Sequence, residues 1–148
     1  MYKYIVLIHI LAATIWTGGH LILSLAVLPK AIKNKSLAML KNFEASFWKI
    51  GITALVLQFL TGIFLAFHYM PHFSEWFSFK VPVSHLVVTK LTLLIITAVL
   101  VFRAKVSGFK NVSEHNLKPL TIHIIVMTVI SVVFVFLGVW YKTGSFGN

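Results

Sequence analysis

The stretch Tyr4–Leu28 reads YIVLIHILAATIWTGGHLILSLAVL and contains no Asp, Glu, Lys or Arg. A helix needs roughly 20 apolar residues to cross about 30 Å of hydrocarbon, and this stretch is longer than that. It is also longer than the roughly 7 to 15 apolar residues of a secretory signal, so we expect it to stay in the mature protein. The stretch therefore predicts a first transmembrane helix.

Three further apolar stretches have the length of a membrane span: Phe47–Tyr69, Val83–Phe102 and Leu120–Tyr141. Of the 148 residues, 59% are hydrophobic and 11% are charged, whereas soluble domains carry about 25% charged residues. Short connections between spans favour antiparallel neighbours. We predict an all-α fold, an integral membrane antiparallel four-helix bundle that forms one domain over residues 1–148 in a lipid bilayer.

Two connections between the spans contain residues that predict where these segments lie relative to the membrane. We expect the first span to end at Pro29, and the polar segment after it, with Leu40 and Phe43, to form a short helix on the membrane surface. The connection 70–82 contains four aromatic rings, among them Trp76, and such rings favour the headgroup level. We therefore expect this connection to lie at the headgroup level.

Basic residues gather at two of the three connections. The chain has 13 Lys and Arg against 3 Asp and Glu, and most of the basic side chains flank the first and third connections, which share one side of a four-span chain. The positive-inside rule places these connections in the cytoplasm, with both termini on the outer face of a bacterial-type cytoplasmic (inner) membrane. Membrane topology accounts for this charge, so no nucleic-acid partner is indicated. The flanking residues are Lys30, Lys33, Lys35, Lys41, Lys49, Arg103, Lys105, Lys110 and Lys118.

Five histidines lie within a span or at its edge, where an ionisable side chain is costly and usually functional. The direction of each span and a rise of about 1.5 Å per residue sort them by depth. His9, His68 and His85 fall in an outer layer, whereas His20 and His123 fall in an inner layer. The sequence therefore predicts two levels at which imidazoles from different helices meet.

Histidines on different helices are suited to hold a haem iron between them. The chain contains no Cys, so the haem would be b-type and bound without thioether links. We expect an outer haem on His9 together with His85 or His68. A second haem, on His20 and His123, is left open.

Two further side chains belong to this prediction. Trp16 lies between His9 and His20 on one face of the first span, and so between layers that are roughly 16 Å apart. Lys90, about two turns inside the third span, would tune the outer haem or reach the interface with its long stem. The alternative for each histidine, a hydrogen bond to a neighbouring carbonyl, stays open.

Copper is the alternative metal. His68, Met70 and His72 form an H-x-M-x-H run at the outer end of the second span. Imidazole and thioether together suit copper, particularly Cu(I). Copper binding or transport across the membrane is therefore an alternative function.

The first span also carries a longer pattern: His9, six further residues, and then Trp16-Thr17-Gly18-Gly19. It resembles the opening helix of the copper-resistance protein D (CopD) family. Leu60-Thr61-Gly62 and Thr89-Lys90-Leu91 are similar to the next helices of that family. The resemblance covers roughly residues 1–105 and implies a small multi-span membrane protein.

The same first-span spacing and the Lys90-Leu91 pair are also similar to the HemJ-type protoporphyrinogen oxidases. In that family a first-helix His and a third-helix Lys are linked to haem and activity, and the match falls on His9 and Lys90. The Leu-Pro-Arg segment of those oxidases has only a displaced counterpart here, Leu28-Pro29-Lys30. Porphyrinogen oxidation is therefore ranked below the broader CopD-like identity.

Taken together, the residues predict a b-type haem-binding membrane protein that transfers electrons across the membrane or at its surface. A quinol, a small oxidant or a redox protein would be its partner. Copper transport and porphyrinogen oxidation remain the alternatives. The sequence assigns no catalytic residue and leaves open whether the chain is a membrane oxidoreductase and whether it forms a homo-oligomer.

Overall fold

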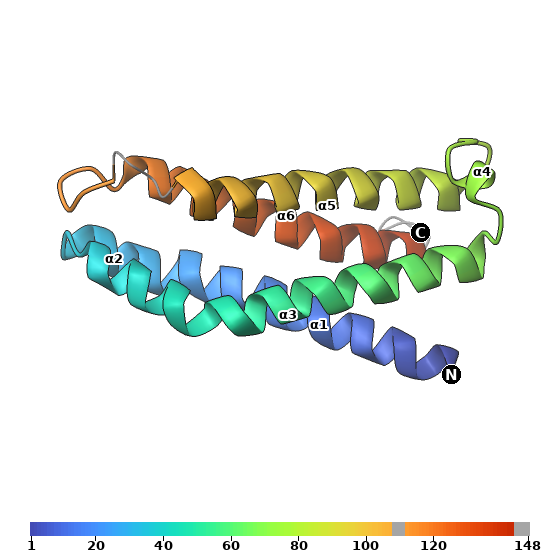
Figure 1. The fold of residues 1–148 in the computed structure, drawn as a ribbon, viewed down its shortest axis with the longest axis horizontal. Helices are drawn as coiled ribbons and strands as arrows, with labels where there is room; N and C mark the ends of the chain where they lie inside the picture. Colours follow the sequence, from blue (N-terminus) through green and yellow to red (C-terminus); the bar gives the residue numbers. More distant parts are fainter. Residues whose placement is uncertain (108–111, 144–148) are drawn as a thin grey trace.

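Four long helices make up the protein in its computed structural model, which describes residues 1–107 and 112–143 (Figure 1). All four are long enough and apolar enough to cross a membrane, and no strand is found within the described ranges. The prediction of an all-α four-helix membrane bundle is confirmed. The elements are α1 (Tyr2–Ile22), a π-helical turn (Leu23–Val27), α2 (Leu28–Lys33), α3 (Leu37–Tyr69), α4 (Phe73–Trp76), α5 (Pro82–Ser107) and α6 (Lys118–Thr143).

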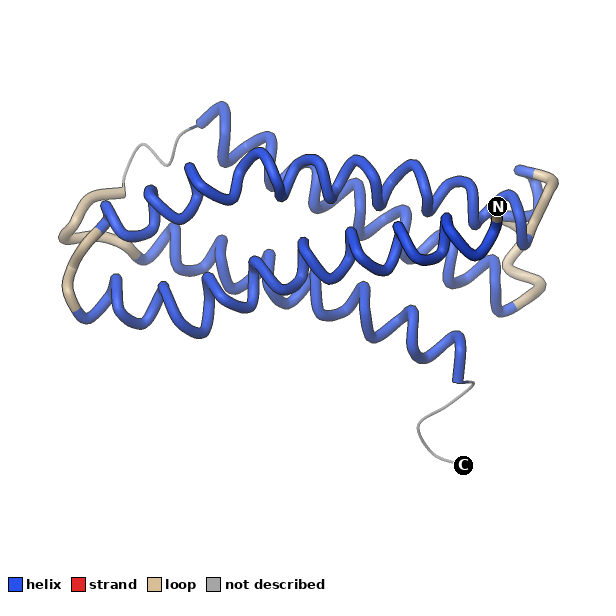
Figure 2. The backbone as a smooth tube through the Cα atoms, turned by 90° about the horizontal axis from the view of Figure 1, so that it is seen from below, coloured by secondary structure: helices blue, strands red, loops and turns tan. Residues whose placement is uncertain are grey.

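The helices run antiparallel, and the connections lie only at the two ends of the bundle (Figure 2). α1 packs most extensively on α3, while α6 packs on both α1 and α5. α3 and α5 contact each other only sparsely, so the bundle is least tightly closed on that side. We call the end with the turn 34–36 and the start of α6 the basic end, and the end with the N-terminus and the last turn of α6 the terminal end (Figure 1).

The first span does not end at Pro29. It continues through α2 to Lys33, and the helix widens into the π-helical turn just before the proline. In a regular α-helix the proline ring would crowd the carbonyl four residues earlier and leave it without its N–H partner. A wider turn with i to i+5 hydrogen bonds relieves this conflict. The predicted boundary at Pro29 is therefore wrong, because the chain changes helix type instead of stopping.

The predicted surface helix after Pro29 is wrong as well. The chain reverses in a tight turn at Lys35, which has a φ of 49°, and α3 then runs unbroken for 33 residues. Leu40 is buried against Leu28, Ala31 and Ile124, so it packs on other helices of the bundle. The segment that the sequence assigned to the membrane surface is the first turns of α3.

Trp76 is buried against the helix ends. It is only 1% exposed, and its Nε1 donates a hydrogen bond to the Met70 carbonyl oxygen at 2.9 Å. Its ring belongs to a buried cluster with Ala66, Met70 and Val87. Trp76 therefore fastens α4 to the terminal ends of α3 and α5, although the other aromatic rings of this connection are exposed.

A seam of small and hydroxyl residues joins α1 to α6. Thr17 Oγ1 donates to the Ser131 carbonyl oxygen at 3.3 Å. Thr128 Oγ1 shares its proton between the Ile124 carbonyl oxygen of its own helix at 2.8 Å and the His20 carbonyl oxygen of α1 at 3.2 Å. Ser131 is fully buried. In a membrane, close packing of small residues and hydrogen bonds between helices take over the role that the hydrophobic effect has in water. This seam therefore fixes the position of α1 against α6.

α1 and α3 are brought together around one aromatic ring. The Phe47 ring of α3 lies directly over Gly19 of α1, and a Cβ atom at Gly51 would come within 2.7 Å of the same ring. A Cβ atom at Gly19 would overlap the ring more severely still, whereas a Cβ atom at Gly18 would meet nothing within 4 Å. The absence of a side chain at Gly19 therefore permits the close approach.

Replacing Gly19 by alanine should destabilise the bundle, because the new methyl group overlaps the Phe47 ring. Overpacking of this kind costs about 1–3 kcal/mol. Gly18→Ala is the matched control, since it adds the same methyl group one residue away in open space. Thermal unfolding in one detergent should give a lower midpoint for Gly19→Ala than for Gly18→Ala. Equal midpoints would contradict the packing described here.

Candidate functional site

His20 is held in place by its ring and by its main chain. Its Nδ1 lies 2.9 Å from the Trp16 carbonyl oxygen, one helical turn earlier. A carbonyl oxygen only accepts, so Nδ1 donates the proton, and in the neutral ring the lone pair is on Nε2. The His20 carbonyl oxygen in turn lies 3.2 Å from the Thr128 hydroxyl, which shares its proton between this oxygen and the nearer Ile124 carbonyl oxygen. The local structure thus selects one tautomer, with Nε2 available to a ligand.

Aromatic rings surround the His20 imidazole. The Trp16 ring centroid is 4.5 Å away at an interplanar angle of 48°, and the Phe47 ring stands edge-on at 6.2 Å. Trp16 is only 5% exposed. These rings exclude water from two sides of His20 and limit its rotation.

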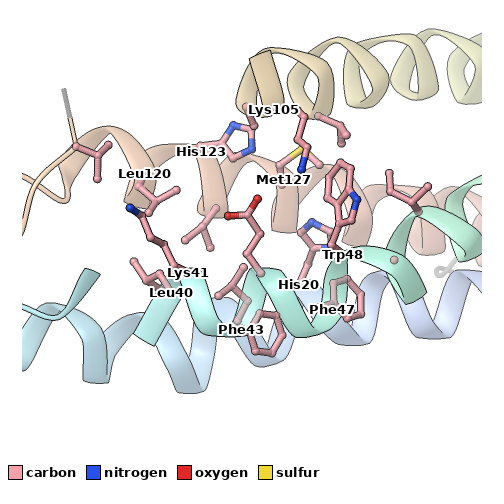
Figure 3. Close-up of a pocket in the computed structure, with 18 of the residues that line it drawn as sticks. His20, Leu40, Lys41, Phe43, Phe47, Trp48, Lys105, Leu120, His123 and Met127 are labelled. Carbon is pink, nitrogen blue, oxygen red and sulfur yellow. The ribbon is translucent and has the colours of Figure 1, made fainter. Parts of the chain in front are cut away.

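A cavity of about 430 Å³ lies beside this imidazole, in the half of the bundle nearer the basic end. His20 from α1 and His123 and Met127 from α6 all line it (Figure 3). His123 and His20 are close enough to interact electrostatically. The structure therefore brings the predicted inner pair of histidines to one cavity. The rest of its wall is mostly apolar and includes Leu40, Phe43, Phe47, Trp48, Leu120 and Ile124.

Charged residues from α3 and α5 also line this cavity, and the sequence analysis missed them. Lys41 and Glu44 come from α3, and Lys105 comes from α5, with its Nζ 4.5 Å from the Trp48 ring centroid. The basic residues had been assigned to membrane topology alone. One signal was present: residues 37, 41, 44, 48 and 51 recur every three or four positions and so share one helix face. All five of these positions line the cavity.

His9 occupies a second polar centre, toward the terminal end. Its Nδ1 is 2.8 Å from Thr61 Oγ1, and the Thr61 hydroxyl donates its own proton to the Leu57 carbonyl oxygen at 2.6 Å. With that proton committed, the Thr61 oxygen accepts from His9 Nδ1–H, and Nε2 again holds the lone pair of the neutral ring. A Cβ atom at Gly62 would lie 3.4 Å from His9 Cε1, so the glycine leaves room for the ring.

Lys90 belongs to the same centre. Its ammonium interacts electrostatically with His9, and its Nζ is 3.5 Å from where a Cβ atom of Gly138 would lie. The acidic residues of the chain are Glu44, Glu75 and Glu114, and among the described residues none forms an ion pair with Lys90. His9 and Lys90, which the family resemblance pairs, thus lie within electrostatic range of each other.

The predicted outer layer is divided between two depths. His9 lies level with Thr61, whereas His68 is seven residues further along α3, about 10 Å nearer the terminal end. His68 is exposed and stacks on Tyr2 with ring centroids 4.4 Å apart. His85 is exposed and contacts the Phe79 ring at 5.3 Å. The structure therefore does not gather these three histidines around one point.

The residues of the predicted copper run face different surroundings. His68 and His72 are exposed, but Met70 is only 4% exposed and packs against Trp76. Across residues 1–107 and 112–143, no group of three His, Cys, Asp or Glu side chains is close enough to hold a metal ion. Another methionine, Met127, lines the cavity together with His20 and His123.

No protein-family model, curated protein or solved structure matches this chain. Its chemistry must therefore be argued from its own side chains. Two features stand out in the described part of the molecule. One is the histidine cavity, defined as the cavity lined by His20, His123 and Met127, and the other is the polar centre of His9 and Lys90.

The hydrogen bonds make a testable statement about both imidazoles. In protein with ¹⁵N-labelled histidine, nitrogen NMR at a pH where the rings are neutral should show Nδ1 protonated at His9 and His20. Thr61→Val should lower the Nδ1-protonated fraction of His9 and leave His20 unchanged, because only His9 uses this hydroxyl. Thr61→Ser keeps the hydroxyl and should preserve the signal. A His9 protonated mainly at Nε2 in the unmodified protein would rule out this geometry.

Proposed function

We propose that this chain is a b-type haem-binding membrane protein that transfers electrons, with haem held in the histidine cavity. One observation carries the proposal: imidazoles from two helices, His20 of α1 and His123 of α6, line one largely apolar cavity of about 430 Å³. Cofactor pockets are usually about 300–1,000 Å³, mostly apolar, and supplied with a few polar groups that fix orientation.

The donor set fits a haem iron. The hydrogen bond to the Trp16 carbonyl oxygen orients His20 as metal-binding histidines are usually oriented, with one ring nitrogen tied to an acceptor and the other available. His123 and Met127 are the candidates for a second ligand, since both imidazole and thioether serve as axial ligands. With no Cys in the chain, the attachment would be non-covalent.

A haem in this position would supply one-electron chemistry with a potential set by its ligands, by burial and by nearby charge. The protein's own residues provide these controls. Trp16 and Phe47 keep water from His20, and the α1–α6 seam holds the two histidine-bearing helices at a fixed separation. We infer that the bundle stands in a cytoplasmic membrane with its basic end inside, because cytoplasmic connections are rich in Lys and Arg.

The polar centre of His9 and Lys90 supports a haem or porphyrin role for the terminal half as well. These are the two residues that match the protoporphyrinogen oxidases, and they lie within electrostatic range of each other here. His9 and His20 are about 16 Å apart along α1, with Trp16 between them. Such a spacing suits a second centre for electron exchange with a quinol or a redox protein near the terminal end.

Copper is the second candidate, and a specific observation favours it. Met127 lines the same cavity as His20 and His123, and one thioether with two imidazoles is a ligand set that copper accepts. This copper site would lie within the bundle, away from the H-x-M-x-H run to which the sequence assigned it. Both candidates use the same cavity, but they depend differently on Met127.

The optical spectrum of the purified protein, with haem and copper measured per chain, tests the proposal. We expect a Soret band that shifts on reduction. His20→Ala and His123→Ala should each remove the same share of the haem, because both residues line one cavity. His85→Ala is the matched control and should remove none, since this histidine is exposed at the terminal end.

The absence of a Soret band after haem is added to the unmodified protein would overturn the haem proposal. Bound copper that is lost in Met127→Leu, without any haem, would establish the copper alternative in its place. Each variant is first compared with the unmodified protein by thermal unfolding, so that loss of cofactor is distinguished from loss of fold.

A further inference from the structure

The histidine cavity reaches the side of the bundle where α3 and α5 contact each other only sparsely. Its lining there carries three charged side chains: Lys41 and Glu44 from α3, and Lys105 from α5. All three are exposed, whereas Trp16 and Met127 on the opposite wall are buried. We call these three charged residues the mouth of the cavity.

Lys105 spans the gap between the two helices. From α5 it places its Nζ over the Trp48 ring of α3, 4.5 Å from the ring centroid (Figure 3). A cation over an aromatic face is held by the ring quadrupole, although weakly where water has access. The Lys105 ammonium is thus kept at the cavity and close to the apolar wall, but it can be drawn away by a stronger acceptor.

Lys41 provides a second cation on the same side of the cavity. It precedes Glu44 by three residues and Trp48 by seven, so it lies about two helical turns nearer the basic end than Trp48. In Figure 3 its ammonium and that of Lys105 stand at separate points along the cavity. Two separated ammonium groups suit a ligand with two negative groups on one edge.

The chemistry of the cavity therefore changes from one side to the other. The inner wall offers imidazoles, a thioether and aromatic rings, while the mouth offers two ammonium groups. A matching ligand has a broad apolar body and a dianionic edge. Haem b has this form, because its two carboxylates leave the same edge of the ring, and hydrogen bonds between ammonium and carboxylate are among the strongest in proteins.

We propose that Lys41 and Lys105 bind the two carboxylates of haem at the mouth of the cavity, so that the ring enters between α3 and α5 with its carboxylate edge at that opening. This inference rests on the proposed haem function and adds which residues recognise the cofactor and how it is oriented. Both lysines are binding residues for the carboxylates and play no part as iron ligands.

Glu44 makes the proposal more specific. It lies between Lys41 and Trp48 on the same face of α3, and its carboxylate repels the carboxylates of the ligand. Removing its charge should therefore strengthen binding of a dianionic ligand, while removing the charge of either lysine should weaken it. A general loss of structure would weaken haem binding in all three variants, so it would not produce changes of opposite sign.

The experiment compares haem with its dimethyl ester, in which both carboxylates are neutral and the ring is unchanged. Binding of each to the full-length protein is measured by optical titration in one non-ionic detergent. We expect the unmodified protein to prefer haem over the ester. Lys41→Gln and Lys105→Gln should each reduce this preference about two- to fivefold, as is typical for an ion pair with access to water, and should leave ester binding unchanged.

Two controls accompany these variants. Glu44→Gln should raise the preference for haem over the ester. Lys49→Gln removes a positive charge from the same helix at an exposed position that does not line the cavity, and it should change nothing. A fall in preference for Lys49→Gln as large as that for Lys105→Gln would show a general effect of surface charge and would overturn the proposal.

The remaining outcomes separate this inference from the function on which it rests. If the unmodified protein binds haem and ester equally well, carboxylate recognition by the lysines is refuted while the haem function stands. If it binds neither compound, the proposed function itself fails. Loss of both haem and ester binding in a lysine variant that unfolds at the same temperature as the unmodified protein would assign the lysine to ring binding, against the proposal.

Discussion

Two hydroxyl hydrogen bonds between α1 and α6 hold the part of the molecule on which the candidate site depends. Thr17 donates to the carbonyl oxygen of Ser131, and Thr128 shares its proton between the carbonyl oxygen of Ile124 and that of His20 itself. Because a helix carbonyl has two lone pairs, it accepts these bonds without giving up its own helical partner. The residue that presents an imidazole to the cavity is thereby also the residue through which α1 is joined to α6. His20 thus serves both the packing of the helices and the candidate site.

The composition was enough to predict four spans, and depth along the helices was enough to bring His20 and His123 to one level. Depth along the helices did not predict the relative positions of His9 and His68, because the register of α1 against α3 depends on the turn between α2 and α3. That turn is centred on Lys35, so residues equally far before and after it lie side by side: His9 meets Thr61, and Tyr2 meets His68. Because the sequence analysis predicted a surface helix after Pro29, it contained no tight turn from which this register could be derived. The burial of Trp76 escaped prediction for a related reason, since a Trp in a short connection has the same signature whether it faces lipid headgroups or seals two helix ends.

Within the bundle the polar residues divide into two centres of different character. The histidine cavity is open toward α3 and α5 and is lined by groups that suit a large, partly charged ligand. The centre of His9 and Lys90 is packed against Gly62 and Gly138, where bare backbone makes room for two polar side chains between helices. A lysine ammonium in a region of low dielectric exerts its field over a longer distance than it would in water. When Lys90 is protonated, the second centre therefore places a positive charge inside the bundle, whether or not it binds a ligand.

The π-helical turn at Leu23–Val27 acts as a phase shift along one continuous helix. In a uniform α-helix each residue advances about 100°, and the buried face marked by Ala12, Trp16 and Gly19 would return near Lys30. The wider turn delays the rotation, so Leu28 and Ala31 take the inward positions and Lys30 is exposed. One continuous helix can thus line the polar cavity with its first part and pack against apolar residues with its last turns. Deleting one residue from the π-helical turn would therefore leave a uniform α-helix in which Ala31 keeps its inward position, because the wide turn holds one extra residue. If the turn became regular α-helix at unchanged length, Lys30 would instead face the contact of Leu40 with Ile124.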